Sequence, residues 1–322
     1  MIKLITDNDL DGISCYIVLK TLCPDEEIKV TFCKSYSHVN NLVLRALEHP
    51  EAYDKLYITD LSVTEYVANK IEVVNDDNHI LLFDHHKTAT WLNNYTWANV
   101  SVDRKMKNGE VKKCCGSEIF KDFLCLVKDV KNKALDEYIE LVRRYDTWEW
   151  KTKYDDMIPS DLNLLYKIKG RSAFMNSILQ SVNDNIPLFS QLDIELINIE
   201  RRRINDYVAI KNNDIISFKI LNYNVGVLFA EQYISELGNR LCELHPELDV
   251  IAMIGQKAIS YRTIKDNVDV SEIAKRYGGG GHKPAAGSPV KKSQLRKVMR
   301  SLLFIKEWYY ENKDFCVFSR NW

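Results

Sequence analysis

The sequence lacks any long hydrophobic run. None of its 322 residues belongs to an uninterrupted apolar stretch of about 18 residues, the length that marks a membrane-spanning helix. The first residues also lack the apolar core of a secretory signal peptide. We therefore expect a cytoplasmic protein that has no membrane segment.

The sequence also lacks an excess of charge of one sign. Its 44 lysines and arginines nearly cancel its 45 aspartates and glutamates, which leaves a formal net charge of −1. Proteins that coat long nucleic acids gain affinity by neutralising many phosphates. The charge balance therefore argues against a protein of that class, although it is compatible with a local basic cleft.

Cysteine pairs with metal-ligand spacing are missing as well. The eight cysteines are scattered and no two form a Cys-x-x-Cys pair, so the sequence does not predict a zinc knuckle. Reduced, mostly buried thiols are the simplest interpretation for a cytosolic protein. The adjacent Cys114 and Cys115 could instead form a redox pair, but a disulfide between neighbours is strained.

The sequence does contain an alternation of short apolar runs and helical segments. Residues 2–6, 56–59 and 80–83 form β-branched or aromatic runs typical of strands, and residues 13–22 and 42–47 have a helical period. Strands that alternate with helices predict an α/β domain with a doubly wound parallel sheet. In that architecture ligands bind at the carboxyl ends of the strands.

Acidic residues or histidines follow each of the three apolar runs, and a further acidic residue follows a predicted helix at residues 135–145. Because the carboxyl ends of parallel strands meet at one edge of a sheet, we expect these side chains to converge. The candidates are Asp7, Asp9, Asp11, Asp60, Asp84, His85, His86 and Asp146.

Carboxylates mixed with imidazole suit Mn²⁺ or Mg²⁺ better than Zn²⁺, which favours closed four-coordinate sites that often contain thiolate. Two such ions about 3.5–4 Å apart can hold both the attacking and the departing oxygen of a phosphoester. A shared carboxylate would bridge the ions, and we assign this role to Asp60. The sequence thus predicts a two-metal phosphoester hydrolase.

Other interpretations of residues 7–12 are weaker. An EF-hand loop would need a glutamate where Val18 stands and a helix before the loop, so it fails. A phosphatase with an aspartyl nucleophile also has Asp-x-Asp after its first strand but needs no later pair of histidines; it stays the weaker enzymatic alternative. A polar turn that caps a helix explains one aspartate. Three aspartates on alternate positions repel one another unless cations lie among them.

The second half of the chain predicts another, smaller α/β domain. Strands are expected at residues 225–229 and 250–254, with a helix at about 231–244 between them. The charged stretch at residues 193–206 is expected to form a linking helix. We therefore expect a catalytic domain at residues 1–185, a linker helix at 186–213 and a second domain at 214–322.

Glycine is rare except in one segment, since five of the twelve glycines lie within residues 278–287. Successive glycines can direct backbone N–H groups into a concavity that binds anions, and an arginine can bind a phosphate with two parallel hydrogen bonds. The segment lacks the Lys-Ser/Thr of a P-loop, so ATP hydrolysis is not indicated. The candidate anion-binding residues are Arg262, Gly279, Gly280, Gly281, His282 and Lys283.

As an ordered set, these motifs resemble those of the DHH phosphoesterases. The matching segments are Asp7-Asn8-Asp9-Leu10-Asp11-Gly12, Thr59-Asp60, Asp84-His85-His86 and Asp146. In the second half, Ser260-Tyr261-Arg262-Thr263 and Gly279-Gly280-Gly281-His282 resemble the DHH-associated substrate domain. The superfamily includes RecJ exonucleases, bacterial nanoRNases, cyclic-dinucleotide phosphodiesterases and one class of inorganic pyrophosphatase.

By matching positions, the resemblance implies two Mn²⁺ ions, for which Mg²⁺ or Co²⁺ could substitute, bound by Asp9, Asp11, Asp60, His85 and Asp146. Asp7 is a further candidate ligand, since RecJ-type members carry aspartate there and many nanoRNase-type members carry histidine. His86 would touch the substrate or assist proton transfer, and Asp84 would support the histidines from behind. The glycine loop would hold a terminal phosphate or nucleotide.

The resemblance further implies hydrolysis of short RNA or DNA oligonucleotides, or of linear dinucleotides, to mononucleotides. A RecJ-like single-strand DNA exonuclease, a cyclic-dinucleotide phosphodiesterase and an inactive nucleotide sensor stay open as alternatives. An inactive sensor should have lost a metal ligand, and Asp7 alone is ambiguous. The pyrophosphatase is disfavoured because its second domain lacks the Gly-Gly-Gly-His loop. A homodimer stays open, and no membrane partner is expected.

Overall fold

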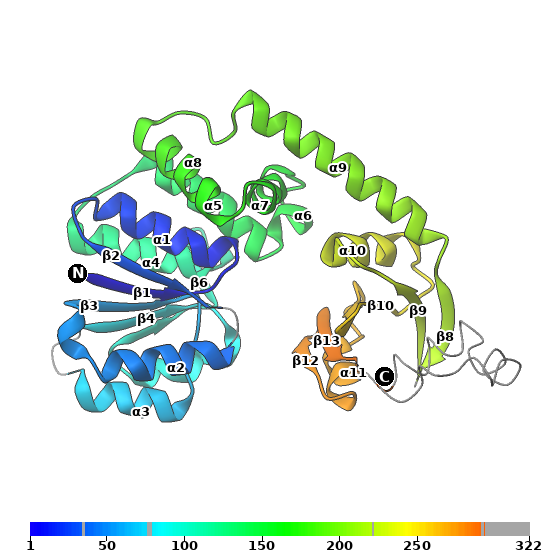
Figure 1. Ribbon diagram of the computed structural model, residues 1–322, viewed down its shortest axis with the longest axis horizontal. Coiled ribbons are helices and arrows are strands. Elements are labelled where there is room, and N and C mark those ends of the chain that lie inside the picture. Colours follow the sequence, from blue (N-terminus) through cyan, green and yellow to red (C-terminus); the bar gives the residue numbers. More distant parts are fainter. Residues whose placement is uncertain (34–35, 76–78, 221, 291–292, 294–322) are drawn as a thin grey trace, which may run out of the picture. The chain divides into compact units, whose positions relative to one another are not determined.

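The computed structural model describes residues 1–33, 36–75, 79–220, 222–290 and 293 (Figure 1). The chain divides into two compact units, Met1–Asn198 and Ile199–Trp322, and the boundary falls within helix α9 (Gln191–Asn212). Each unit has its own sheet and its own hydrophobic core. Cys316 and the last part of the predicted second domain lie outside the described residues.

The first unit is built on a five-stranded sheet whose strands all run parallel, in the order β2-β1-β3-β4-β5. Helices cover both faces of this sheet (Figure 1). The doubly wound parallel sheet predicted from the sequence is therefore confirmed. The strands are β1 (Ile2–Thr6), β2 (Ile28–Phe32), β3 (Lys55–Thr59), β4 (Ile80–Asp84) and β5 (Ala98–Val100). The helices are α1 (Leu10–Leu22) and α4 (Gly116–Lys128) on one face, and α2 (Tyr36–Leu47) and α3 (Glu65–Val74) on the other.

The central strands are apolar because both of their faces are covered. Leu4 and Ile5 in β1, and Leu56 and Ile58 in β3, are completely buried. Strands covered on both faces read as nearly continuous hydrophobic runs rather than as alternating patterns. This is why short apolar runs in the sequence correctly predicted these strands.

The register of the sheet brings the ends of the central strands side by side. Thr6 at the end of β1 pairs with Thr59 at the end of β3, and Thr59 also pairs with Phe83 in β4. Three of the predicted acidic positions therefore lie in one row at the edge of the sheet where ligands bind in such folds. They are Asp7, Asp60 and Asp84.

Further helices complete the first unit. Helix α5 begins after Asn132, whose side chain accepts a hydrogen bond from the N–H of Leu135 and so caps the helix. Asp146 is the last residue of α5, so the end of this helix determines where its carboxylate lies. The helices are α5 (Lys133–Asp146), α6 (Glu149–Thr152), α7 (Ile158–Lys169) and α8 (Arg171–Asp184), and the short elements are η1 (Pro50–Ala52), η2 (Lys87–Asn94), β6 (Asp103–Lys105) and β7 (Val111–Lys113).

The second unit contains a mixed six-stranded sheet in the order β12-β13-β11-β10-β9-β8. Strands β9 and β10 run parallel, and the other described neighbours are antiparallel. Helix α10 packs on one face and helix α11 on the other, as an α/β domain requires. The elements are β8 (Ile216–Ile220), β9 (Tyr223–Phe229), α10 (Ile234–Leu244), β10 (Val250–Ile254), β11 (Ala258–Arg262), α11 (Val270–Arg276), β12 (Gly280–His282) and β13 (Ala285–Pro289). Within the described part of the chain, no helix has the length and apolar character needed to cross a bilayer.

Candidate active site

The predicted acidic and histidine side chains of the first unit lie together. They form three groups whose potential ligand atoms lie within 4.8 Å of one another inside each group. Asp60 and His85 each belong to two groups, so the groups overlap into one cluster. The groups are Asp7, Asp9 and Asp60; Asp60, Asp84, His85 and His86; and Asp11, His85 and Asp146.

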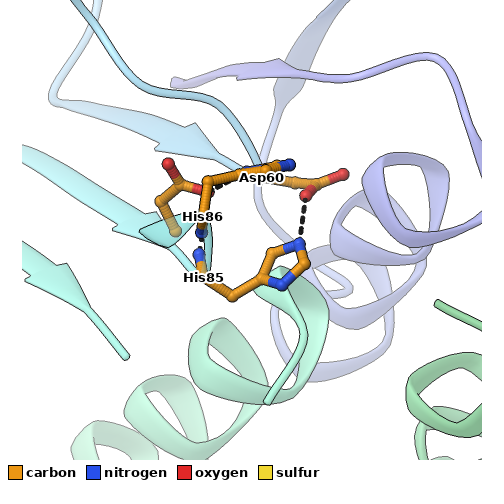
Figure 2. Close-up of side chains that lie close together, drawn as sticks. Asp60, His85 and His86 are labelled. Atoms are coloured by element: carbon orange, nitrogen blue, oxygen red, sulfur yellow. Dashed lines mark hydrogen bonds and ion pairs between the residues drawn. The ribbon is translucent and has the colours of Figure 1, made fainter. Parts of the chain in front are cut away.

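His85 lies among three carboxylates from different elements. Its Nε2 atom lies 3.3 Å from Asp60 Oδ1, which follows β3 (Figure 2), and 3.5 Å from Asp146 Oδ2 at the end of α5. The same atom lies 3.9 Å from Asp11 Oδ2 in α1. Desolvation lowers the pKa of His85, although Asp11 partly offsets the effect and the backbone carbonyl of Cys114 also favours the charged ring. A neutral imidazole is the form that binds a metal ion.

Asp84 orients the two histidines that follow it. Its Oδ1 atom accepts hydrogen bonds from the backbone N–H of His85 at 2.8 Å and from that of His86 at 3.3 Å. The Nδ1 atom of His86 lies 2.7 Å from the same oxygen. This hydrogen bond raises the pKa of His86 to about 9. The Asp84 carboxylate therefore favours the protonated form of the His86 ring.

The amino terminus of α4 holds Asp11. The backbone N–H of Gly116 donates to Asp11 Oδ2 at 2.6 Å, and that of Ser117 donates to Oδ1 at 3.0 Å. The Ser117 hydroxyl donates to the same Oδ1. Free N–H groups and the helix dipole both favour a negative charge at this end. Sequence reasoning missed Gly116 and Ser117; the signal was a Gly-Ser pair at the start of a helical period.

Gly12 allows the tight turn that presents the first aspartates. The backbone N–H of Gly12 donates to Asp9 Oδ1 at 2.9 Å, so Asp9 caps α1. A Cβ atom at Gly12 would lie 2.3 Å from the carbonyl oxygen of Asp7, so no larger residue fits. The turn therefore leaves the carboxylates of Asp7 and Asp9 within reach of Asp60.

The cluster fits divalent cations. The Oδ2 atoms of Asp60 and Asp84 are buried and have no hydrogen-bond partner among the described residues. Burial raises the pKa of Asp60 and of Asp146, and repulsion from Asp11 and neighbouring carboxylates raises both further. Buried carboxylates with unsatisfied oxygens are costly unless a cation neutralises them. Carboxylate and imidazole ligands are compatible with Mn²⁺ and Mg²⁺.

Removal of metal should make the stability of the protein fall as the pH rises. Desolvation and repulsion from Asp11 raise the pKa of Asp9 to about 6, and the pKa values of Asp60 and Asp146 are raised in the same direction. An acid with a raised pKa in the folded state binds more protons than the unfolded chain does between the two pKa values. The free energy of unfolding therefore decreases as the pH rises through that window.

We expect the melting temperature of the EDTA-treated protein to fall between about pH 4 and 6, the window between the ordinary and the raised pKa of Asp9. The gain on adding Mn²⁺ should grow over the same range, because the ligands must be deprotonated. Scanning fluorimetry at constant ionic strength measures both quantities. A metal-free melting temperature that rises steadily across this range would contradict the prediction.

In the second unit, the predicted glycine loop is part of a β-hairpin. Gly280–His282 forms strand β12, which pairs with β13. A Cβ atom at Gly279 would lie 2.0 Å from the carbonyl oxygen of Gly287, so close packing of two backbones requires this glycine. The N–H of Gly279 donates to the carbonyl of Ala274 at 2.8 Å and is not available to an anion. The N–H of Gly279 thus already has a partner within the domain, and substrate binding by this segment stays a prediction.

The other candidate residues of the second unit present polar groups. His282 and Lys283 are exposed. Arg262 packs over Gly238, where an added Cβ atom would lie 2.6 Å from the arginine Cγ. Its Nη1 atom donates to the Tyr261 carbonyl at 3.0 Å. Gly280 has open space around it, whereas Gly281 has a left-handed backbone, with φ of 144°, and lies against β13.

A separate hollow of about 690 Å³ lies on the sheet face that α11 partly covers. Apolar side chains of β9, β10 and β11 line most of it, and it includes Gly278 but none of the predicted anion-binding residues. Its lining does not suit a phosphate group, so the carboxylate cluster of the first unit is the better candidate for phosphoester chemistry.

The seven described cysteines are all free thiols, and six of them are buried. Cys114 and Cys115 do not form a disulfide, and desolvation raises the pKa of both thiols. Raised pKa values make thiols less reactive. The prediction of reduced, mostly buried thiols is confirmed for these residues.

Comparison with known proteins agrees with this geometry. No family model matches the sequence. The chain is 36% identical over 297 residues to the oligoribonuclease NrnB of Bacillus subtilis, which covers 90% of this chain and 73% of the relative. Two solved structures share the fold at low identity. A pGpG-specific phosphodiesterase, PggH, from Vibrio cholerae has a TM-score of 0.54, 13% identity and coverage of 94% of this chain and 98% of its own. The exonuclease RecJ bound to manganese has a TM-score of 0.53, 16% identity and coverage of 92% and 87%.

Proposed function

The chain belongs to the NrnB-like DHH-family phosphoesterases, and from this premise we propose that it hydrolyses short oligonucleotides to mononucleotides with the help of two Mn²⁺ ions. The observation that carries the proposal is the overlap of three ligand groups through Asp60 and His85. Overlapping groups can hold two ions close enough to share a carboxylate. Asp60 is the proposed bridge, because it belongs to two groups and its Oδ2 atom has no hydrogen-bond partner among the described residues.

The residues divide the chemistry between them. Two bound divalent ions would supply an activated water and would stabilise negative charge on the phosphate. Asp7, Asp9, Asp11, Asp60, His85 and Asp146 are the proposed ligands. Hydrolysis forms one bond from the water oxygen to phosphorus and breaks the bond from phosphorus to the departing oxygen. His86, whose protonated form the Asp84 carboxylate favours, would donate its proton to that oxygen while Asp84 keeps the ring oriented.

Substrate length is proposed to depend on the second unit. Arg262, His282 and Lys283 offer cationic or donor groups for a terminal phosphate, and Gly280 has open space beside it. A group that binds the end of the substrate favours fragments of a few nucleotides over long strands. We also propose that the enzyme acts in the cytoplasm; a homodimer remains a prediction.

The proposed function predicts a strong preference for the shortest substrates. The purified protein with Mn²⁺ is given 5′-labelled RNA and DNA ladders from two to twenty-four nucleotides long. We expect the shortest RNA rungs to disappear first and to yield mononucleotides. The variant His282→Ala should raise KM for these rungs and leave kcat nearly unchanged, because His282 lies outside the metal cluster.

Length-independent digestion of DNA would contradict the proposal and would favour a RecJ-like exonuclease. Exclusive cleavage of dinucleotides would restrict the proposed substrates to dinucleotides. Absence of any Mn²⁺-dependent hydrolysis, in a protein that still binds Mn²⁺, would favour the nucleotide sensor instead.

A further inference from the structure

A buried arginine, Arg143, lies in α5, the helix that ends at the proposed ligand Asp146. Its side chain has no exposed surface. Its Nε and Nη2 atoms donate to the two carboxylate oxygens of Glu140 at 2.9 and 2.8 Å. Its Nη1 atom donates to Glu149 Oε2 at 2.6 Å and to the backbone carbonyl of Lys113 at 3.1 Å. A buried guanidinium needs partners for its charge, and here they come from three different segments.

The bond to Glu149 links two residues that lie on either side of Asp146 in the sequence. Arg143 precedes this ligand by three residues and Glu149 follows it by three. Between them the chain leaves α5 through Trp148, whose φ of 64° is left-handed. The ends of helices are prone to fray, and Asp146 is the last residue of α5. The Arg143–Glu149 ion pair connects the last turn of α5 to the first residue of α6 and so restrains the chain at Asp146.

The bond to Lys113 connects Arg143 to the segment that leads into α4. Lys113 ends β7, and the next residues lead directly into α4. In this segment the Cys114 carbonyl interacts with the ring of His85, and the N–H groups of Gly116 and Ser117 bind Asp11. A single guanidinium therefore holds both the helix end that carries Asp146 and the segment that supports two other ligands.

We propose that Arg143, paired with Glu149, is a positioning residue for one of the two metal ions, the one bound by Asp11, His85 and Asp146. These three residues form one of the ligand groups, and each is supported by a segment that Arg143 contacts. The group of Asp7, Asp9 and Asp60 has no such contact with Arg143 among the described interactions. The inference rests on the proposed two-metal function.

The neighbouring Arg144 provides a matched control. It also bonds to Glu140, at 2.9 Å, but its other partners are Asp156 at 3.5 Å and the ring of Tyr154 at 4.0 Å. Neither Asp156 nor Tyr154 belongs to a ligand group. Replacing Arg144 by lysine removes a guanidinium group from the same helix but leaves the Arg143–Glu149 ion pair intact.

The test is a calorimetric titration of the EDTA-stripped full chain with Mn²⁺, in wild type, Arg143→Lys, Glu149→Gln and Arg144→Lys. We expect wild type to bind two ions. Arg143→Lys should weaken one of them by about 10–100-fold, the range that outer-shell changes cost, and leave the other within about threefold. Glu149→Gln should weaken the same ion, and Arg144→Lys should weaken neither. In hydrolysis assays the Mn²⁺ concentration for half-maximal rate should rise in parallel, with kcat regained in excess Mn²⁺.

Several results would overturn the inference. They are wild-type affinity for both ions in Arg143→Lys, equal weakening of both ions, an equal effect of Arg144→Lys, and loss of folding in both Arg143→Lys and Glu149→Gln. Each would make Arg143 a purely structural residue. A wild-type protein that binds no Mn²⁺ would instead reject the proposed two-metal function, so the two failures are distinguishable.

Discussion

Replacement of Asp60 by asparagine is expected to reduce kcat at saturating Mn²⁺ by more than about 100-fold. Substitution of residues that only support metal ligands typically costs up to about 100-fold in activity, and Asp60 is itself a proposed ligand. Asp60 is the proposed bridge between the ions, and one of its oxygens lies 3.3 Å from His85 Nε2. Asparagine keeps the shape of the side chain but removes its charge. It also tolerates the left-handed backbone of Asp60, with φ of 55°, whereas alanine would add strain there.

The same substitution should stabilise the metal-free protein. The pKa of Asp60 is raised first by desolvation and then by repulsion from Asp11, Asp9 and Asp146, so an ionised Asp60 destabilises the fold. Removing one buried charge removes part of this repulsion. We expect the melting temperature in EDTA to rise by roughly 2–4 °C, the shift that about 1 kcal/mol produces in domains of this size, while the gain on adding Mn²⁺ largely disappears.

A matched control is Asp136→Asn, which removes an exposed carboxylate from α5 that pairs with Lys121. This variant should keep wild-type kcat and a wild-type gain in melting temperature with Mn²⁺. The prediction for Asp60 is wrong if Asp60→Asn retains more than a tenth of wild-type kcat, or if Mn²⁺ still raises its melting temperature as much as in wild type.

Replacement of Gly116 by alanine is expected to weaken Mn²⁺ binding by about 10–100-fold. The added Cβ atom would lie 2.9 Å from Asp60 Cβ, 3.0 Å from Asp60 Cα and 3.1 Å from Asp11 Oδ2. Contacts this short force the backbone of Asp60 or the carboxylate of Asp11 to move, and both are proposed ligands. Helix propensity alone predicts that this substitution stabilises α4, since alanine is a better helix former than glycine. A loss of metal affinity would therefore come from tertiary contacts.

Gly109→Ala is the control for this substitution. Gly109 lies between β6 and β7 with φ of 84°, and an added Cβ atom there would meet nothing within 4 Å. The variant should lose about 1 kcal/mol of stability through backbone strain and keep its affinity for Mn²⁺. Calorimetric titration and thermal unfolding of both variants separate the two effects. An affinity of Gly116→Ala within about twofold of wild type would contradict the prediction.

The sheet of the first unit could be predicted because its signals are local. The apolar runs that became β1, β3 and β4 are buried on both faces and end at polar residues, and both features are visible in the sequence. The rule that ligands bind at the carboxyl ends of parallel strands then brought the residues after these strands together. The role of the glycine segment in the second unit was harder to predict, because a run of glycines does not reveal which of its N–H groups are free. In the fold, the N–H of Gly279 is bonded to Ala274.

By itself, the sequence determined the doubly wound architecture and the identities of the carboxylates and histidines that gather at one edge of the sheet. Only the tertiary structure decided what supports them. Gly116 and Ser117 bind Asp11 across more than a hundred residues of sequence, and Arg143 joins β7 to the exit of α5. The physical reason is that strand and turn patterns arise from neighbouring residues, whereas hydrogen bonds between distant segments depend on how helices pack, which no local pattern encodes.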